Sequence, residues 1–179
     1  MSHLRYRVLL LLLLITLGAC APPVTHDLSG SLAVFDYSYH NDLIVEEAQR
    51  LARGDYFGLP EAERDAVWIE AVGLVRGTPC TDGVETFPGI HAGAPVRIMD
   101  ADGSMLADSA LSGGFVDLLP YPDVQAKVIA VCRFEFEVPE LADTTGYAIL
   151  VGDQEPKTFT KPGLEAAGWT VSLEFGVNR

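Results

Sequence analysis

The sequence predicts a mainly β fold: an antiparallel β-sandwich of the Ig-like, Greek-key type with a small helical insertion. Three observations lead to this prediction. Residues from Lys127 to Val138 alternate between apolar and polar side chains, as in a strand with one buried face. Turn sequences rich in Gly, Pro and Asp separate short apolar segments from residue 80 onward. Two cysteines, Cys80 and Cys132, follow an export signal and remain for a disulfide.

The chain begins with a segment typical of a cleaved signal peptide. Arg5 and Arg7 precede an apolar run from Val8 to Leu17. That run is too short to span a bilayer, because a transmembrane helix needs about 20 residues. A positive n-region followed by a short apolar h-region is the pattern of a secretory signal. We therefore expect residues 1–19 to be removed on export.

The expected cleavage site resembles the bacterial lipobox. Leu17-Gly18-Ala19-Cys20 suits the lipoprotein peptidase, which cuts before a cysteine that already carries diacylglycerol. Two or three acyl chains on Cys20 anchor a protein stably, whereas a single chain binds only marginally. We expect a protein lipid-anchored to the cell membrane through Cys20, on its extracytoplasmic face. The alternative is an ordinary signal peptidase site, cut after Ala21.

The charge of the chain excludes some partners. The sequence has 12 Lys and Arg residues against 25 Asp and Glu residues, a formal net charge of −13. Binding of nucleic acid needs Lys and Arg to neutralise phosphates, and electrostatic docking on anionic lipid needs them as well. We therefore expect no nucleic-acid partner, and membrane attachment through the lipid rather than through the protein surface.

A tether, a strand and a helical segment are expected before Cys80. Residues 20–30 include two prolines and predict a flexible tether, and residues 31–179 then form a single domain. Ser31 to Ser38 alternates and predicts the first strand.

Residues 42–71 predict the helical excursion. Acidic residues at its start and Arg residues before Gly54 follow the order that a helix favours, and a Gly just past the end is typical. Pro60 is expected to begin a second helix. The segment from Ala66 to Arg76 suits either a continued helix or a strand, and we expect helix to about Ala71 and strand after it.

From Cys80 onward the pattern is one of short strands. The expected strands span residues 96–99, 104–110, 127–138, 146–151, 157–160 and 169–175. Asp100-Ala101-Asp102-Gly103 predicts the hairpin turn between the first two. Residues 118–123, with two prolines, predict a loop, and Pro139 is expected to end the Lys127 strand. Thr160 is expected to cap one helical turn, closed by Gly168.

Turns and core positions after residue 80 carry a resemblance. The pattern comprises a Cys-x-x-Gly turn, a hairpin, a Cys-x-Phe-x-Phe-x-Val strand, a Tyr strand and a closing apolar strand. The matching residues are Cys80, Gly83, Val96, Ile98, Asp100, Gly103, Leu106, Cys132, Phe134, Phe136, Val138, Pro139, Tyr147 and Trp169 to Gly176. This pattern resembles the small β domain of many exported proteins and lipoproteins of actinomycetes. The resemblance implies a fold and a location, but it does not imply any particular activity. Gly152-Asp153-Gln154 replaces the basic turn expected there, and Asp42 to Val75 lies outside the resemblance.

The spacing of the cysteines, histidines and acidic residues indicates which disulfide and metal sites the chain could form. An exported protein meets oxidising conditions, so we expect a Cys80–Cys132 disulfide, with two free buried thiols as the alternative. The Asp100 turn invites a calcium site, but it lacks carboxylates at the first and last positions of an EF-hand loop. His26 lies in the expected tether, His40 in an expected loop or helix cap, and His91 in an expected loop. We expect no metal and no cofactor.

Catalytic residues do not stand out. Glu135 and Glu137 share one face of a strand, at a separation that the paired carboxylates of a glycosidase could use. Acid–base roles need environments that separate two pKa values, and alternation places both residues on the polar face, so a solvated face is favoured. We expect no catalytic residues.

The leading hypothesis is a non-catalytic binding or structural module with an unknown envelope protein or polymer as partner. The expected partner surface is Asn41 to Arg76, or the loops Phe87 to Ala94 and Leu118 to Asp123, because loops on a rigid scaffold often carry function. The alternatives are a hydrolase of envelope polymers that uses carboxylates, and a carrier with an apolar pocket.

Overall fold

The computed structural model describes residues 23–35, 37–80, 87, 89–120 and 128–176. It is mainly β, with 44% strand and 26% helix, which confirms the predicted class. The elements in chain order are β1 (Thr25–Val34), α2 (Tyr37–Leu51), η1 (Tyr56–Gly58), α3 (Glu61–Val75), β2 (Pro95–Asp100), β3 (Met105–Ala110), β4 (Phe115–Pro120), β5 (Val128–Ala142), β6 (Gly146–Val151), β7 (Lys157–Thr160), α4 (Lys161–Ala166) and β8 (Thr170–Phe175). The predicted signal peptide and Cys20 lie outside the described residues.

The described strands form two four-stranded sheets, with strand orders β4-β5-β1-β8 and β3-β2-β6-β7. Neighbouring strands are antiparallel except β1 and β8, which run parallel. The two sheets share one hydrophobic core. Leu32 and Phe134 from the first sheet belong to the same buried cluster as Ile98 and Ile149 from the second. Burial of these apolar side chains between the sheets is the main favourable term for the fold.

β5 confirms the predicted alternation. Cys132, Phe134 and Phe136 are at most 3% exposed, and they point into the shared core. Glu135 and Glu137 lie on the opposite, exposed face. The period of two therefore places one face of β5 in the core. The other face is exposed at Glu135 and Glu137 but buried at Val131, which packs with Ala33 and Phe35.

The prediction that Pro139 ends this strand is wrong. β1 pairs with β5 on both sides of Pro139, across a register shift between His26 and Leu28. Glu140 there has a φ of 53°, a left-handed conformation that fits an irregularity in the ladder. β4 pairs with β5 only up to Arg133, so Pro139 also has no β4 residue to bond. Proline is tolerated at such bulges and free edges because no N–H donor is required.

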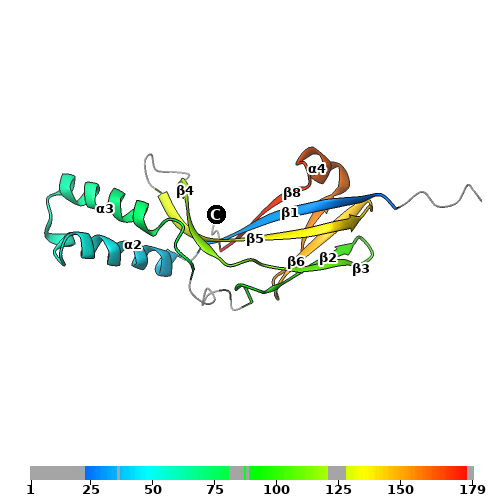
Figure 1. Ribbon diagram of the computed structural model, residues 1–179, viewed down its shortest axis with the longest axis horizontal. Helices are drawn as coiled ribbons and strands as arrows, with labels where there is room; N and C mark the ends of the chain where they lie inside the picture. Colours follow the sequence, from blue (N-terminus) through cyan, green and yellow to red (C-terminus); the bar gives the residue numbers. More distant parts are fainter. Residues whose placement is uncertain (1–22, 36, 81–86, 88, 121–127, 177–179) are drawn as a thin grey trace, which may run out of the picture.

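Residues 37–75, which we call the helical arm, lie at one end of the molecule (Figure 1). α2 and α3 pack on each other and on the end of the β4–β5 pair. The buried residues of this second core are Ile44, Ala48, Tyr56, Ala71, Val72, Val75, Val116 and Ala130. Ala130 and Cys132 lie on the same face of β5, so that one face contributes to both cores.

The predicted excursion, 42–71, is too short at both ends. α2 begins at Tyr37, inside the segment predicted as the first strand, and α3 continues to Val75, through the segment predicted as a strand. Ala71, Val72 and Val75 are all buried on the inward side of α3. Their spacing is helical, but apolar residues on the other side of α3 obscure that period in the sequence.

The predicted tether, 20–30, is wrong from Thr25 onward, because β1 begins there and pairs with β5 and β8. Leu28 is 1% exposed. Polar residues on either side of Leu28 weaken the sequence signal for a strand. The pairing with residues more than 100 positions away supplies the stability that local sequence does not show.

The predicted loop over residues 118–123 is wrong for Leu118 to Pro120, which lie in β4; residues 121–123 are outside the described part. Pro120 ends this outer strand, where a missing donor is tolerated.

The predicted β2–β3 hairpin is confirmed, and the Asp100 carboxylate accepts hydrogen bonds from the backbone N–H groups of Asp102 and Ser104. The predicted Thr160 cap is confirmed as well, since its hydroxyl accepts from the Gly163 N–H.

The predicted disulfide between Cys80 and Cys132 is confirmed, with a Cα–Cα distance of 6.0 Å. It joins the segment that follows α3 to the middle of β5, and Cys80 packs against both cores. The two cysteines are 52 positions apart in the sequence, so the bond closes a long loop of the chain. It therefore links the helical arm to the sheets covalently as well as by packing.

We predict that Gly30→Ala destabilises the protein by about 1–3 kcal/mol, as overpacking of a core does. A Cβ at Gly30 would lie 2.0 Å from the ring of Phe136, which covers this position from β5. The measurement is the free energy of unfolding in urea.

The matched control is Gly73→Ala in α3, where a Cβ meets nothing within 4 Å. This change should be neutral or stabilise by up to about 1 kcal/mol, because Ala favours helix over Gly. Equal effects of the two substitutions would contradict the packing of Phe136 on Gly30.

Candidate functional site

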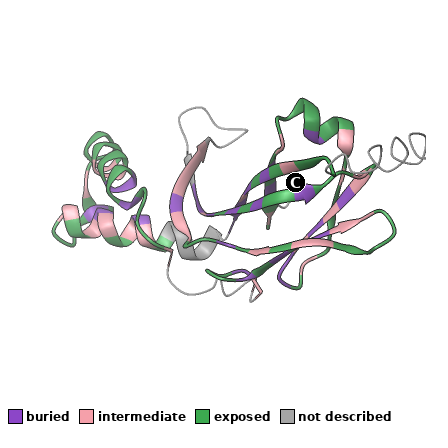
Figure 2. Cartoon of the chain, turned by 45° about the vertical axis from the view of Figure 1, so that its right-hand side comes forward, coloured by how far each residue is buried: buried purple, intermediate pink, exposed green. Residues whose placement is uncertain are grey.

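The helical arm exposes apolar side chains that the fold does not use. Among the described residues, the exposed large hydrophobic side chains are Val24, Phe57, Ile69, Leu74 and Met105. Three of them belong to the arm: Phe57 is 66% exposed, Ile69 72% and Leu74 50%. Figure 2 shows the outer turns of the arm as exposed, with buried residues on its inner side.

The exposed face of α3 is organised as a stripe. Ala62, Ala66, Ile69 and Gly73 are all exposed and follow one another at spacings of four, three and four, which places them on one side of a helix. We call these four residues the outer stripe. They lie opposite the buried side of α3, which packs on α2 and the sheet. A helix at a protein surface normally presents polar residues there, so this face is unusual.

Carboxylates flank the outer stripe. Glu63 and Glu70 lie on one side of it and Asp65 on the other, and all three are exposed. The nearest basic residue beyond the C-terminal end of the stripe, Arg76, contacts Asp117 at 3.5 Å. On α2, Arg50 is paired with Glu47 one turn earlier and also lies near enough to Glu70 to feel its charge. The surface around the outer stripe is therefore apolar at its centre and acidic along both flanks.

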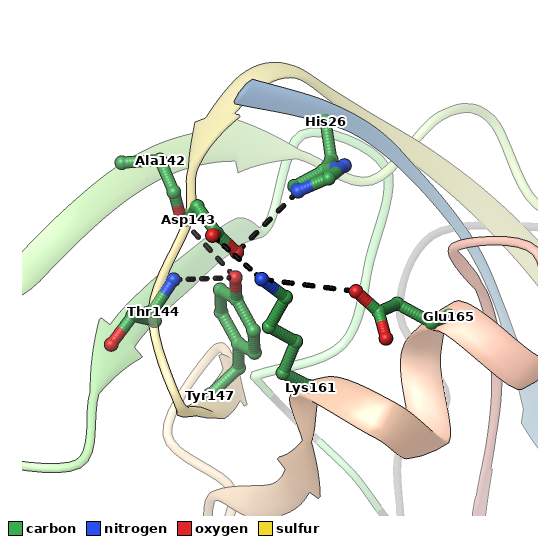
Figure 3. A network of polar contacts seen from close by, with 7 residues as sticks. All are labelled: His26, Ala142, Asp143, Thr144, Tyr147, Lys161 and Glu165. Carbon is green, nitrogen blue, oxygen red and sulfur yellow. Dashed lines mark hydrogen bonds and ion pairs between the residues drawn. The ribbon is translucent and has the colours of Figure 1, made fainter. Parts of the chain in front are cut away.

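A second group of polar residues lies where β1 starts (Figure 3), at the end of the molecule away from the arm (Figure 1). The Asp143 carboxylate accepts a hydrogen bond from the Lys161 ammonium at 2.6 Å and faces His26 Nε2 at 3.5 Å. Lys161 also lies 3.8 Å from Glu165. The buried Tyr147 hydroxyl donates to the Ala142 carbonyl and accepts from the Thr144 N–H. These contacts tie α4 and the β5–β6 turn to the first residues of β1.

His26 was predicted to lie in the tether, and this is wrong. Its ring stacks on Trp169 with a centroid distance of 3.8 Å, and Trp169 in turn meets Tyr147 edge-on at 5.7 Å. Trp169 has a φ of 57°, a left-handed conformation that directs the chain from α4 into β8. The sequence offered no signal for this contact, because it joins residues 143 positions apart.

Hydrogen-bond donors lower the pKa of Asp143 and of Asp117, as the hydrogen bond from Arg50 does for Glu47. The hydrogen bond from Lys161 lowers the pKa of Asp143, and the same bond raises the pKa of Lys161. Desolvation alone would raise the pKa of Asp117. Hydrogen bonds from the Leu118 N–H and the Arg133 guanidinium outweigh that effect and lower it. Asp143 and Asp117 are held in their charged form by donors, so they stabilise structure and are poor proton acceptors.

The other predicted site residues do not converge. Glu135 and Glu137 are both exposed on the sheet surface. His91 is exposed and its ring nitrogen contacts the Ala92 carbonyl. Within the described ranges, no three His, Cys, Asp or Glu side chains lie close enough together to hold a metal ion. Of the predicted partner loop Phe87 to Ala94, Ile90 and Ala94 are buried in the core.

An open groove of about 480 Å³ separates β7 from β8, the outer strands of the two sheets. Its lining residues are Pro156, Lys157, Thr158, Phe159, Ser172, Leu173 and Glu174. The Lys157 ammonium lies 5.7 Å from the centroid of the Phe175 ring. A lysine and a proline on an outer strand are common protections against edge-to-edge pairing. The mixed lining does not match the apolar pocket expected of a carrier.

We predict that Asp143→Asn lowers stability at neutral pH and that this loss disappears in acid. The folded pKa of Asp143 lies below its ordinary value of 3.8. Ionised Asp143 therefore favours the fold above about pH 4, and that contribution is lost as the pH falls through the folded pKa. The measurement is the urea midpoint of both proteins at neutral pH and at the lowest pH at which both still fold.

The matched control is Asp102→Asn, in the exposed hairpin turn. It should leave the midpoint unchanged at neutral pH. A loss for Asp143→Asn of the same size at both pH values would show that the ion pair with Lys161 is not its source.

In the part of the chain that the structure describes, no helix is long and apolar enough to cross a membrane. Comparisons of this chain with protein-family models, with curated proteins and with solved structures returned no match.

Proposed function

We propose that this protein is a lipid-anchored lipoprotein of the cell envelope that works as a non-catalytic binding module. Its anchor is the lipid on Cys20, and its binding surface is the helical arm. The partner is a protein of the envelope. The observation that carries the proposal is the exposed apolar surface of the arm, because groups of exposed apolar side chains on monomeric proteins mark interaction sites.

The direction of β1 supports an anchored module with the arm at its far end. β1 runs from Thr25 toward the arm, and the arm follows directly after it (Figure 1). Its ten residues span about 33 Å at 3.3 Å per residue. Only four residues separate Cys20 from Thr25. An anchor at Cys20 would thus hold the start of β1 near the bilayer and place the arm away from it.

The lipobox and the shared core support the remaining parts of the proposal. Leu17 to Cys20 fits a lipoprotein signal at each of its four positions. We further propose that the two sheets form a β-sandwich of the Ig-like, Greek-key type, as in the exported β domains that this sequence resembles. The support is that both sheets contribute to one buried cluster and that the chain crosses between them after β1, β3, β5 and β7.

We predict that a photoreactive amino acid at Ile69 of the full chain, in intact cells, cross-links to one discrete envelope protein. Met105 is the matched control position. It is 54% exposed, it lies on the β2–β3 hairpin outside the arm, and it should not yield that product. The products are detected by their shift in electrophoretic mobility.

Cys20→Ala removes the expected lipid site and tests the anchor in the same cells. For the native chain, the cross-linked product should fractionate with membranes. When Cys20 is changed, the lipoprotein should no longer fractionate with membranes. No product from Ile69, or the same products from Ile69 and Met105, would contradict a binding function of the arm.

A further inference from the structure

We propose that the outer stripe of α3 is the docking surface for a cationic amphipathic helix of the partner protein. The proposal rests on the binding function proposed above and specifies the chemistry of what is bound. Three properties of the described surface support it: its shape, its unused apolar area and its charge.

The unused apolar area shows that α3 is built to be covered on two sides. Its inner side is buried by α2 and by the end of the β4–β5 pair. Its outer side carries Ile69, which is 72% exposed, in a row with Ala62, Ala66 and Gly73. A helix that is apolar on opposite sides is normally found inside a protein rather than at its surface. Among the described residues this side stays uncovered: the four residues of the row are exposed, and a Cβ at Gly73 would meet nothing within 4 Å, so another molecule has room to cover it.

The shape of the outer stripe suits a helix. Three of its four residues are Ala or Gly, so a partner backbone can approach closely, and Ile69 projects between them. Helices pack at axis separations of about 8–10 Å, the smaller values requiring small side chains at the contact. From Ala62 to Gly73 the stripe extends about 17 Å at 1.5 Å per residue. It therefore matches about three turns of a second helix.

The negative charge around the outer stripe favours a partner whose contacting surface is positively charged. Glu63 and Glu70 on one flank and Asp65 on the other would face the borders of a docked helix. Lys or Arg beside the apolar row of the partner would meet these carboxylates and speed the encounter. A second copy of this chain would instead bring acidic flanks together. An anionic lipid surface would be repelled for the same reason.

The test maps what is attached to Ile69 after photo-cross-linking of the full chain in intact cells. We expect mass spectrometry to place the attachment in a partner segment with apolar residues at helical spacing and Lys or Arg on both borders. Attachment to an acidic or non-helical segment, to lipid, or to a second copy of this chain would overturn the proposal while leaving a binding function intact. Failure to form any product would instead overturn the binding function itself.

A charge reversal gives an independent readout. The double change Glu63→Lys and Glu70→Lys should lower the cross-link yield from Ile69 at least tenfold. The matched control is Glu135→Lys with Glu137→Lys, another exposed pair of carboxylates, on β5 away from the arm. Circular dichroism and the thermal midpoint of each variant show that the fold is retained. An equal yield from the two double variants would overturn the role given to the flanking carboxylates.

Discussion

One face of one strand supports two hydrophobic cores. On β5, Ala130 packs under the helical arm, and Cys132, Phe134 and Phe136 pack under the second sheet. The inner face of β5 must be apolar over a greater length than one pair of sheets requires, and this explains why it gives the clearest alternation in the sequence. The disulfide from Cys132 to Cys80 lies where the two cores meet, so packing and covalent linkage act at the same place.

This arrangement has a consequence for the arm. The buried sides of α2 and α3 pack on each other and on β4 and β5, and this packing leaves the outer stripe exposed. At the other end, His26, Asp143 and Lys161 hold the start of β1 to α4 and to the β5–β6 turn. A rigid strand pair thus separates an end secured by ion pairs and stacked rings from an end that presents apolar surface. Such a division suits a protein that is fixed at one end and binds at the other.

Local patterns predicted the elements whose stability is local. The β2–β3 hairpin depends on the Asp100 turn, and α4 depends on the Thr160 cap, and both were visible in the sequence.

Elements stabilised by distant residues were missed. The first half of β1 is polar apart from Leu28 and forms a strand because β5 and β8 pair with it. The end of α3 was misread because residues on both of its sides are apolar, so neither a helical nor a strand period dominates. The histidine contact with Trp169 could not be foreseen, since it depends on how β1 meets β8. The arm was expected as a partner surface, but the outer stripe emerged only once the inner side of α3 was known.

The dependence of both cores on β5 is tested most directly at the disulfide. We predict that Cys80→Ala with Cys132→Ala lowers the free energy of unfolding by about 2–5 kcal/mol, as loss of a native disulfide does in small exported domains. Native-state hydrogen exchange, read segment by segment, should show faster exchange in α2 and α3 as well as in β5, because Cys80 contacts both cores. Faster exchange confined to the sheets, with the arm unchanged, would contradict the account of one strand joining the two cores.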